Sequence, residues 1–185
     1  MTAILGIEDQ GKLYLIGDSY TGDSSQDYKA LCLSPKVYKI SEFIVGLCGS
    51  PRHELLLEEI LVKETKKKSF TPSLEWLKYK LPKLLRNSCV EAGMYIVENG
   101  EKTMGTSGFI IGFQKTFYYL DSDFSLWATK TGIVGIGVAS QYALGALSIL
   151  EKDKTLTVEE KLTKALDATT EFSHFVCKPY TIVSI

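Results

Sequence analysis

The chain has 185 residues, of which 45% are hydrophobic and 23% are charged, and its formal net charge is −1. This length and apolar content suffice to bury a sizeable core, and we expect a single domain over residues 1–185. The near-neutral charge gives no electrostatic reason to expect nucleic acid or a membrane surface as a partner, and no apolar run approaches the ~20 residues that span a bilayer.

The first half of the chain predicts four strands followed by two helices. The strands cover residues 2–8, 12–17, 36–40 and 43–48. A turn over residues 9–12, which contains a glycine, joins the first two strands as a hairpin. The helices cover residues 50–64, with Ser50 as the N-cap, and residues 72–90, in which Pro82 is expected to introduce a kink.

The second half predicts three strands, two helices and a last strand. These elements cover residues 107–114, 117–121, 126–129, 140–152, 157–174 and 180–185. The sequence from Thr157 to Glu160 is typical of a capping box, and the buried side of the following helix is expected to include Leu162, Leu166 and Phe172. Strands, two helices, strands and two helices in this order predict an α+β fold with helices packed on sheet faces.

The residue after the initial methionine is the first candidate for chemistry. If Met1 is removed, Thr2 carries a hydroxyl nucleophile and a free α-amine base on one residue. A hydroxyl is a weak nucleophile and an α-amine with a pKa of ~8 is a mediocre base, so both need tuning by their neighbours. The Asp18 carboxylate could hold a lysine ammonium, best supplied by Lys36, that lowers the pKa of the hydroxyl and favours the neutral amine.

Several short segments together carry a resemblance to a known family. They are Thr2 to Ile7, Gly17 to Ser19, Pro35 to Ile40, Val45 to Ser50, and a later glycine turn with its helix, Gly135 to Leu147. In order and spacing they resemble the proteasome β-type family, above all its bacterial HslV peptidase branch and the HslV-like proteins of bacteria and phages. The resemblance covers nearly the whole chain and implies the four-layer α-β-β-α sandwich of N-terminal-nucleophile hydrolases.

The resemblance also implies a role for each matched residue. Thr2 is the nucleophile, and Asp18 with Lys36 forms the supporting ion pair. The Gly49 backbone N–H forms the oxyanion hole, a donor typically worth on the order of 3 kcal/mol of transition-state stabilisation. Leu47 and Cys48 are expected to contact the substrate, with Leu47 flooring an apolar pocket beside the scissile bond.

One position departs from the family pattern. Val138 stands after Gly137, where active members usually have a serine that joins the hydrogen-bond network around the threonine amine. Valine can neither donate nor accept a hydrogen bond, and Ser140, two residues later, could substitute only if the turn is rearranged.

Three hypotheses therefore stay open. The first is a self-compartmentalising threonine-type peptidase, and the second is a catalytically inactive proteasome-like homo-oligomeric ring with a structural or interaction role. The third, a small-molecule amidase on the same fold, predicts isolated subunits with an open cleft. Taken singly, Asp18 is also a common turn residue and Lys36 an ordinary solvated lysine, so only the ordered set supports catalysis.

The resemblance implies partners as well. Family members assemble into rings of six or seven subunits, stacked face to face, which enclose a chamber that admits only unfolded chains. We therefore expect self-association and unfolded polypeptide substrates, with an ATP-dependent unfoldase as a candidate partner.

Cysteine and histidine usage bears on compartment and cofactors. The four cysteines are scattered without a C-x-x-C pair, and the start of the sequence has no leader of signal-peptide type, so we expect a cytoplasmic protein. The two histidines, His53 and His174, lie far apart without a ligand pattern around them, and we expect neither a metal nor a cofactor.

Overall fold

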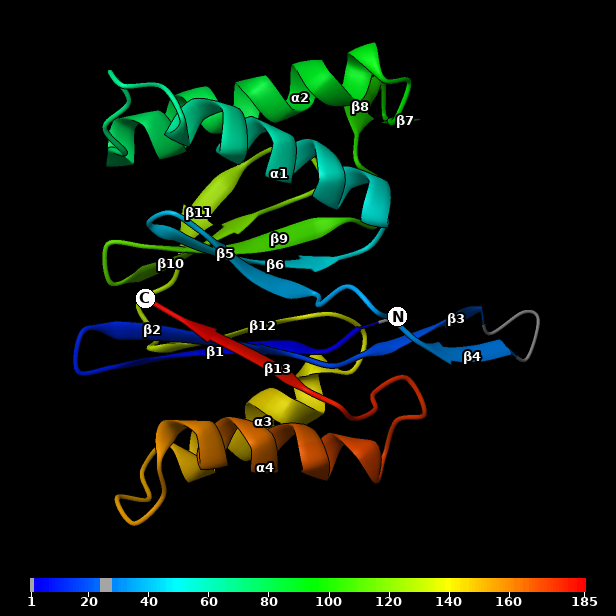
Figure 1. Ribbon diagram of the computed structural model, residues 1–185. Helices are drawn as coiled ribbons and strands as arrows, with labels where there is room; N and C mark the ends of the chain where they lie inside the picture. The colour runs from blue at the N-terminus through cyan, green and yellow to red at the C-terminus, as the bar shows by residue number, and fades with distance from the viewer. Residues whose placement is uncertain (1, 24–27) are drawn as a thin grey trace.

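The computed structural model describes residues 2–23 and 28–185 (Figure 1). Its helices are α1 (Pro51–Thr65), α2 (Leu81–Glu91), α3 (Ser140–Leu150) and α4 (Val158–Thr170), with a π-helical turn, η1 (Trp76–Lys80), before α2. Its first strands are β1 (Ile4–Asp9), β2 (Lys12–Gly17), β3 (Tyr20–Asp23), β4 (Tyr28–Leu31), β5 (Val37–Ile40) and β6 (Phe43–Cys48). The later strands are β7 (Ile96–Glu98), β8 (Glu101–Thr103), β9 (Gly108–Phe113), β10 (Thr116–Leu120), β11 (Leu126–Ala128), β12 (Ile133–Ile136) and β13 (Thr181–Ser184).

Two antiparallel sheets form the middle of the molecule. One has the strand order β12-β1-β2-β13 and the other the order β11-β10-β9-β6-β5, while β3 with β4 and β7 with β8 form separate hairpins. Figure 1 shows the two sheets stacked, with α1 and α2 covering the five-stranded sheet and α3 and α4 covering the four-stranded one. The predicted α+β class and the four-layer α-β-β-α sandwich are confirmed.

Each of the three spaces between the layers holds its own apolar cluster. Phe43, Phe109 and Phe113 belong to the cluster that packs the five-stranded sheet against α1 and α2. Leu5 and Ile16 belong to the cluster under α3 and α4. Between the two sheets lies a third cluster, made of Ile4, Leu13, Leu15, Val37, Ile44, Ile110, Phe117 and Val134. Alternate residues of β1 therefore point to different layers, as the period of a strand requires.

The predicted helix starts agree with the structure. The Ser50 hydroxyl accepts a hydrogen bond from the Arg52 N–H and thereby caps α1. Thr157 and Glu160 form the reciprocal capping box at the start of α4. Because each cap satisfies backbone N–H groups that have no partner within the helix, these short polar patterns fix where the helices begin.

The helix predicted over residues 72–90 is irregular before Pro82. The Leu81 N–H donates to the carbonyl oxygen of Trp76, five residues back, which gives the π-helical turn η1. Pro82 follows directly as the second residue of α2 and has no N–H to donate to the turn before it. The disturbance expected at Pro82 therefore takes the form of a widened turn just before it.

Other differences concern short elements and a helix end. The hairpins β3-β4 and β7-β8 and the strand β12 were not predicted, because runs of three or four residues carry too few positions to show a period. α4 ends at Thr170 rather than at 174. Phe172 thus lies beyond the helix, is 72% exposed and stacks on Tyr142, so the prediction that it faces the core is wrong.

Among the described residues, no helix combines the length and the apolar content needed to cross a bilayer.

The contact between the sheets gives a stability prediction. A Cβ atom built on Gly112 in β9 would lie 2.6 Å from Cγ1 of Ile44 on the neighbouring strand and 3.1 Å from Cδ1 of Leu13 in the facing sheet. Gly112→Ala should therefore lower the free energy of unfolding by about 1–3 kcal/mol. Gly145 in α3 has open space at the same position, and Gly145→Ala should raise stability by up to ~1 kcal/mol, since alanine is the better helix former. Urea unfolding measures the free energy of unfolding of both variants. Equal values for Gly112→Ala and Gly145→Ala would contradict the tight packing at Gly112.

Candidate active site

The Asp18 carboxylate, just after β2, is the centre of the candidate site. It is 1% exposed, and its two oxygens accept hydrogen bonds from separate backbone groups. Oδ1 accepts from the Ala3 N–H at 3.0 Å and Oδ2 from the Tyr20 N–H at 2.8 Å. A buried carboxylate needs such partners, because its desolvation is otherwise costly. Asp18 thereby fixes the residue that follows Thr2.

Lys36 completes the surroundings of this carboxylate. Its Nζ lies 2.8 Å from Asp18 Oδ1, and the side chains of Lys36 and Asp18 are 13% and 0% exposed. The Lys36 backbone carbonyl accepts from the Leu47 N–H at 3.2 Å, so β6 positions the start of β5 and with it the lysine. The pairing of Asp18 with Lys36 predicted from sequence is present in the structure.

The segment before β13 holds the turn that carries Asp18. The Ser19 N–H donates to the Cys177 carbonyl oxygen at 3.1 Å, and the Ser19 hydroxyl donates to the carbonyl oxygen of Pro179. Burial and the hydrogen bond to Asp167 raise the pKa of the Tyr180 phenol in this segment, and the charge of Asp18 adds to the rise. Residues far apart in the sequence thus fix the direction of the Asp18 side chain.

Thr2 packs against Gly137, and Gly137 lines a cleft. Thr2 is 5% exposed, and Gly137 has a φ of +104° with its Cα against the Thr2 backbone. A Cβ on Gly137 would clash with the Thr2 carbonyl oxygen, so only glycine fits both this φ and this contact. The glycine turn identified in the sequence therefore packs directly on the candidate nucleophile. Met1 lies outside the described residues.

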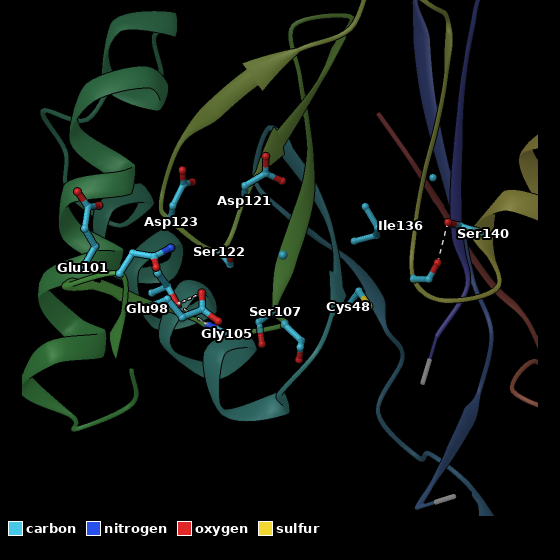
Figure 2. A pocket seen from close by; sticks show the side chains of 16 residues that line it. Cys48, Glu98, Glu101, Gly105, Ser107, Asp121, Ser122, Asp123, Ile136 and Ser140 are labelled. Carbon is cyan, nitrogen blue, oxygen red and sulfur yellow. Dashed lines mark hydrogen bonds between the residues drawn. The ribbon is translucent and has the colours of Figure 1, made fainter. Parts of the chain in front are cut away.

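The two residues that the sequence analysis weighed near this turn take different positions. The Ser140 hydroxyl, in the first turn of α3, donates to the Gly137 carbonyl oxygen at 2.7 Å, and Ser140 is 6% exposed (Figure 2). The Val138 side chain is 60% exposed. Ser140 thus supports the turn, while Val138 offers no polar group.

Gly49, the candidate oxyanion donor, lies between the end of β6 and the N-cap of α1. Its φ is +126°, and a Cβ at this position would clash with Ser107. Because a glycine here lets the chain turn sharply, the end of β6 leads straight into the first turn of a helix, where backbone N–H groups are available for anions.

The cleft has a volume of about 800 Å³ and an acidic side. Figure 2 shows Glu101, Asp121 and Asp123 on one side of it and Ile136 and Ser140 on the other. Hydrogen bonds from the Ser125 hydroxyl and N–H lower the pKa of Asp123, so this carboxylate is ionised at neutral pH. None of the described residues that line the cleft is lysine or arginine, so the cleft is electronegative.

Leu47 and Cys48, both expected to contact the substrate, lie on opposite faces of β6. Cys48 lines the cleft, and burial raises the pKa of its thiol while the Lys36 ammonium opposes that shift. Leu47, the next residue back, is 5% exposed and packs in the core under α1 and α2. Alternation along β6 points these side chains to opposite faces, which leaves Leu47 outside the described lining of the cleft.

Sequence reasoning missed several residues of this region. They are the carboxylates Glu98, Glu101, Asp121 and Asp123, and the pair His53 and Ser107. The carboxylates lie at the first or last residue of a short strand or in the loop after one, positions that give no signal by themselves. Within the described residues, no group of three or more His, Cys, Asp and Glu side chains could hold a metal ion.

Comparison with known proteins places the fold. No protein-family model matches the chain, and no curated protein sequence matches it significantly. Among solved structures, BPH from Thiobacillus denitrificans has a TM-score of 0.78 at 14% identity over 100% of this chain and 97% of that chain. The same protein in complex with epoxomicin gives a TM-score of 0.77 at 15% identity, covering 100% and 98% of the two chains.

Two further solved structures are similar to this chain in fold. HslV from Trypanosoma brucei has a TM-score of 0.69 at 19% identity over 99% of this chain and 98% of that chain. A structure described as a helical assembly of the Anbu complex from Pseudomonas aeruginosa has a TM-score of 0.71 at 15% identity. The match covers 100% of this chain and 81% of that chain. At these identities the likeness concerns the fold, and the chain has the proteasome β-type, HslV-like fold.

The buried ion pair generates a prediction about stability. Lys36→Met leaves the Asp18 carboxylate buried without its cation and should lower the free energy of unfolding by about 3 kcal/mol. Lys39→Met, three residues later and within β5, is the matched control: Lys39 is exposed, and its loss should cost less than ~0.5 kcal/mol. Thermal and urea unfolding compare the two, and a Lys36 variant as stable as the Lys39 variant would contradict the importance of the pair.

Proposed function

We propose that this chain, which has the proteasome β-type fold, is the subunit of a self-compartmentalising threonine peptidase with Thr2 as the N-terminal nucleophile. One observation carries the proposal: Asp18 binds both the Ala3 N–H, directly after Thr2, and the Lys36 ammonium. Asp18 and Lys36, predicted from separate motifs, thus meet next to the residue that follows Thr2, and Gly137, which packs on the Thr2 backbone, lines the cleft.

In the proposed reaction, Thr2 Oγ attacks the carbonyl carbon of a peptide bond. The α-amine of Thr2 takes the hydroxyl proton and later donates it to the leaving amine as the C–N bond breaks. Water then attacks the acyl-enzyme ester, passes a proton back to Thr2 Oγ through the same amine, and releases the carboxylate product. The amine is free only after Met1 is removed, so removal is a required step.

Two groups support this chemistry electrostatically. A lysine ammonium close to Thr2 favours the ionised hydroxyl and the neutral amine, and the ion pair with Asp18 keeps Lys36 in place. The Gly49 N–H, at the start of α1, is the proposed donor to the oxyanion of each tetrahedral intermediate. Cys48 lines the same cleft and is proposed to contact the substrate, with Leu47 behind it.

We propose that the site acts within an assembly of several copies of this chain. A solved Anbu complex with this fold is described as a helical assembly, and the resemblance implies rings of six or seven subunits. We propose a homo-oligomer in the cytoplasm, acting on unfolded polypeptides and served by an ATP-dependent unfoldase.

A specific observation favours a second candidate function. Val138 presents an exposed apolar side chain beside Gly137, where a hydroxyl would be needed near the Thr2 amine, and the nearby Ser140 hydroxyl is bonded to the Gly137 carbonyl. A catalytically inactive ring with a structural or interaction role accounts for this. The ion pair of Asp18 and Lys36 favours the peptidase.

Intact mass measured before and after incubation with epoxomicin tests the nucleophile. The Thiobacillus denitrificans neighbour has been solved in complex with epoxomicin, which makes this compound a suitable probe. We expect the mass to lack one methionine and to rise by one inhibitor per subunit. Thr2→Ala should abolish both the adduct and peptide hydrolysis, because it removes the attacking oxygen, while the assembly state on a sizing column stays unchanged.

Two outcomes of this experiment would contradict the proposal. Hydrolysis that survives Thr2→Ala would remove Thr2 from the mechanism. Retained methionine without an adduct would support the inactive ring instead. Thr157→Ala, which removes a cap of α4, is the control and should leave adduct formation unchanged.

Val138→Ser tests whether the missing hydroxyl limits the rate. Because Val138 is 60% exposed, the change should cost less than ~0.5 kcal/mol of stability. Single-turnover acylation should become faster by about 10-fold or more, since a positioned proton-transfer partner typically contributes on that scale. Val138→Ala shortens the side chain without adding a hydroxyl and should stay at the original rate. Equal rates in the serine and alanine variants would exclude this role for position 138.

A further inference from the structure

A buried hydrogen-bonded chain lies directly behind Gly49. His53 is in the first turn of α1, and Ser107 comes just before β9. His53 Nδ1 lies 2.8 Å from Ser107 Oγ, and His53 Nε2 lies 3.0 Å from the carbonyl oxygen of Met94, between α2 and β7. The Ser50 N–H donates to Ser107 Oγ at 2.9 Å. The chain therefore runs from Met94 through the imidazole and the hydroxyl to the residue after Gly49.

The direction of each hydrogen bond follows from its partners. A carbonyl oxygen only accepts, so His53 Nε2 carries a proton and donates to Met94. In the neutral imidazole Nδ1 then accepts, and the Ser107 hydroxyl donates to it. The Ser107 oxygen keeps lone pairs for the Ser50 N–H. Because His53 and Ser107 are 7% and 3% exposed, water does not compete freely for these bonds.

Ser107 also contacts Gly49 itself. Gly49 has a φ of +126°, and a Cβ on it would clash with the Oγ and the backbone of Ser107. Ser107 thus holds the turn over residues 49–50 both by packing against Gly49 and by accepting the Ser50 N–H bond. Ser107 lines the cleft, so this support reaches the place where a substrate carbonyl would lie.

We infer that Ser107 and His53 are positioning residues, which hold the turn of Gly49 and Ser50 so that the Gly49 N–H is preorganised as the oxyanion donor. The inference rests on the proposed function for the role of Gly49. His53 fixes the rotamer of Ser107, and Ser107 fixes the turn. Preorganisation matters because an oxyanion donor stabilises the transition state only if it need not reorient during the reaction.

The first arm of the test measures the turn without any activity. Hydrogen exchange followed by mass spectrometry on the whole assembly reports the backbone N–H groups of residues 49–52, which belong to Gly49, Ser50 and Arg52, because Pro51 has none. Ser107→Ala and His53→Ala should each speed this exchange by about tenfold, because the turn loses its anchor. His53→Asn should restore much of the protection, since its side-chain oxygen can accept from Ser107 in place of Nδ1. The His53→Asn variant also tests the inference if the two alanine variants do not fold.

The second arm measures the reaction. Ser107→Ala and His53→Ala should lower kcat for peptide hydrolysis by about 10- to 100-fold, the range expected when a catalytic donor is misplaced. KM should change by less than ~2-fold, since neither side chain is proposed to bind the substrate. A general loss of structure would instead change the melting temperature and both constants. Activity in His53→Asn should recover in step with its exchange protection.

Matched controls lie elsewhere in the chain. His174→Ala removes the other histidine, which is exposed, and Ser148→Ala removes a serine hydroxyl bonded within α3. Both should leave exchange at residues 49–52 and kcat unchanged.

The two arms separate the possible failures. Unchanged exchange at residues 49–52 in both alanine variants overturns the positioning role, whatever the activity. Faster exchange with unchanged kcat overturns the link to Gly49 and leaves the proposed function intact. A wild-type protein that forms no adduct with epoxomicin overturns the proposed function and the catalytic half of this inference, and the exchange arm still decides whether His53 and Ser107 hold the turn.

Discussion

The rest of the site depends on one buried carboxylate. Asp18 has no exposed side-chain surface, yet it accepts from two backbone N–H groups and a lysine, so its charge is compensated on every side that the structure describes. The Ala3 bond ties the start of β1 to the end of β2, and the Lys36 bond ties both to the facing sheet. Because one side chain joins the two sheets near the start of β1, the end of β2 and the start of β5, the position of Thr2 follows from the packing of the sandwich.

The sequence predicted the parts of the site that lie within short, ordered motifs. Asp18 follows a strand, Lys36 precedes one and Gly49 follows another, so each could be placed by its neighbours alone. Ser107 and His53 could not, because 54 residues separate them and their contact depends on the meeting of α1 with β9. Most predicted elements were found, whereas the π-helical turn and the short hairpins depend on packing and hydrogen bonds that a periodicity in a single sequence does not reveal.

The turn at Gly137 combines a close backbone contact with an unusual side chain. Gly137 is fixed against Thr2, and Ser140 stabilises the turn through the Gly137 carbonyl. The hydroxyl available in this segment is thus used to shape the backbone. Val138, free of packing restraints at 60% exposure, is the position at which the chain could gain or lose a polar group without disturbing the fold. The balance between the two candidate functions therefore depends on a side chain that stability does not constrain.

The three separate apolar clusters have a consequence for how such a sequence can change over evolutionary time. Substitutions in one cluster have few partners in another, so their effects on stability should be nearly additive, and each layer can repack without a matching change elsewhere. Most core positions can then change without a matching change in another layer. This agrees with the fold that this chain shares with BPH and HslV at identities of only 14% and 19%. Non-additive effects should then be strongest at the strand ends around Thr2, where Asp18 binds the Ala3 N–H and Gly137 packs on the Thr2 backbone.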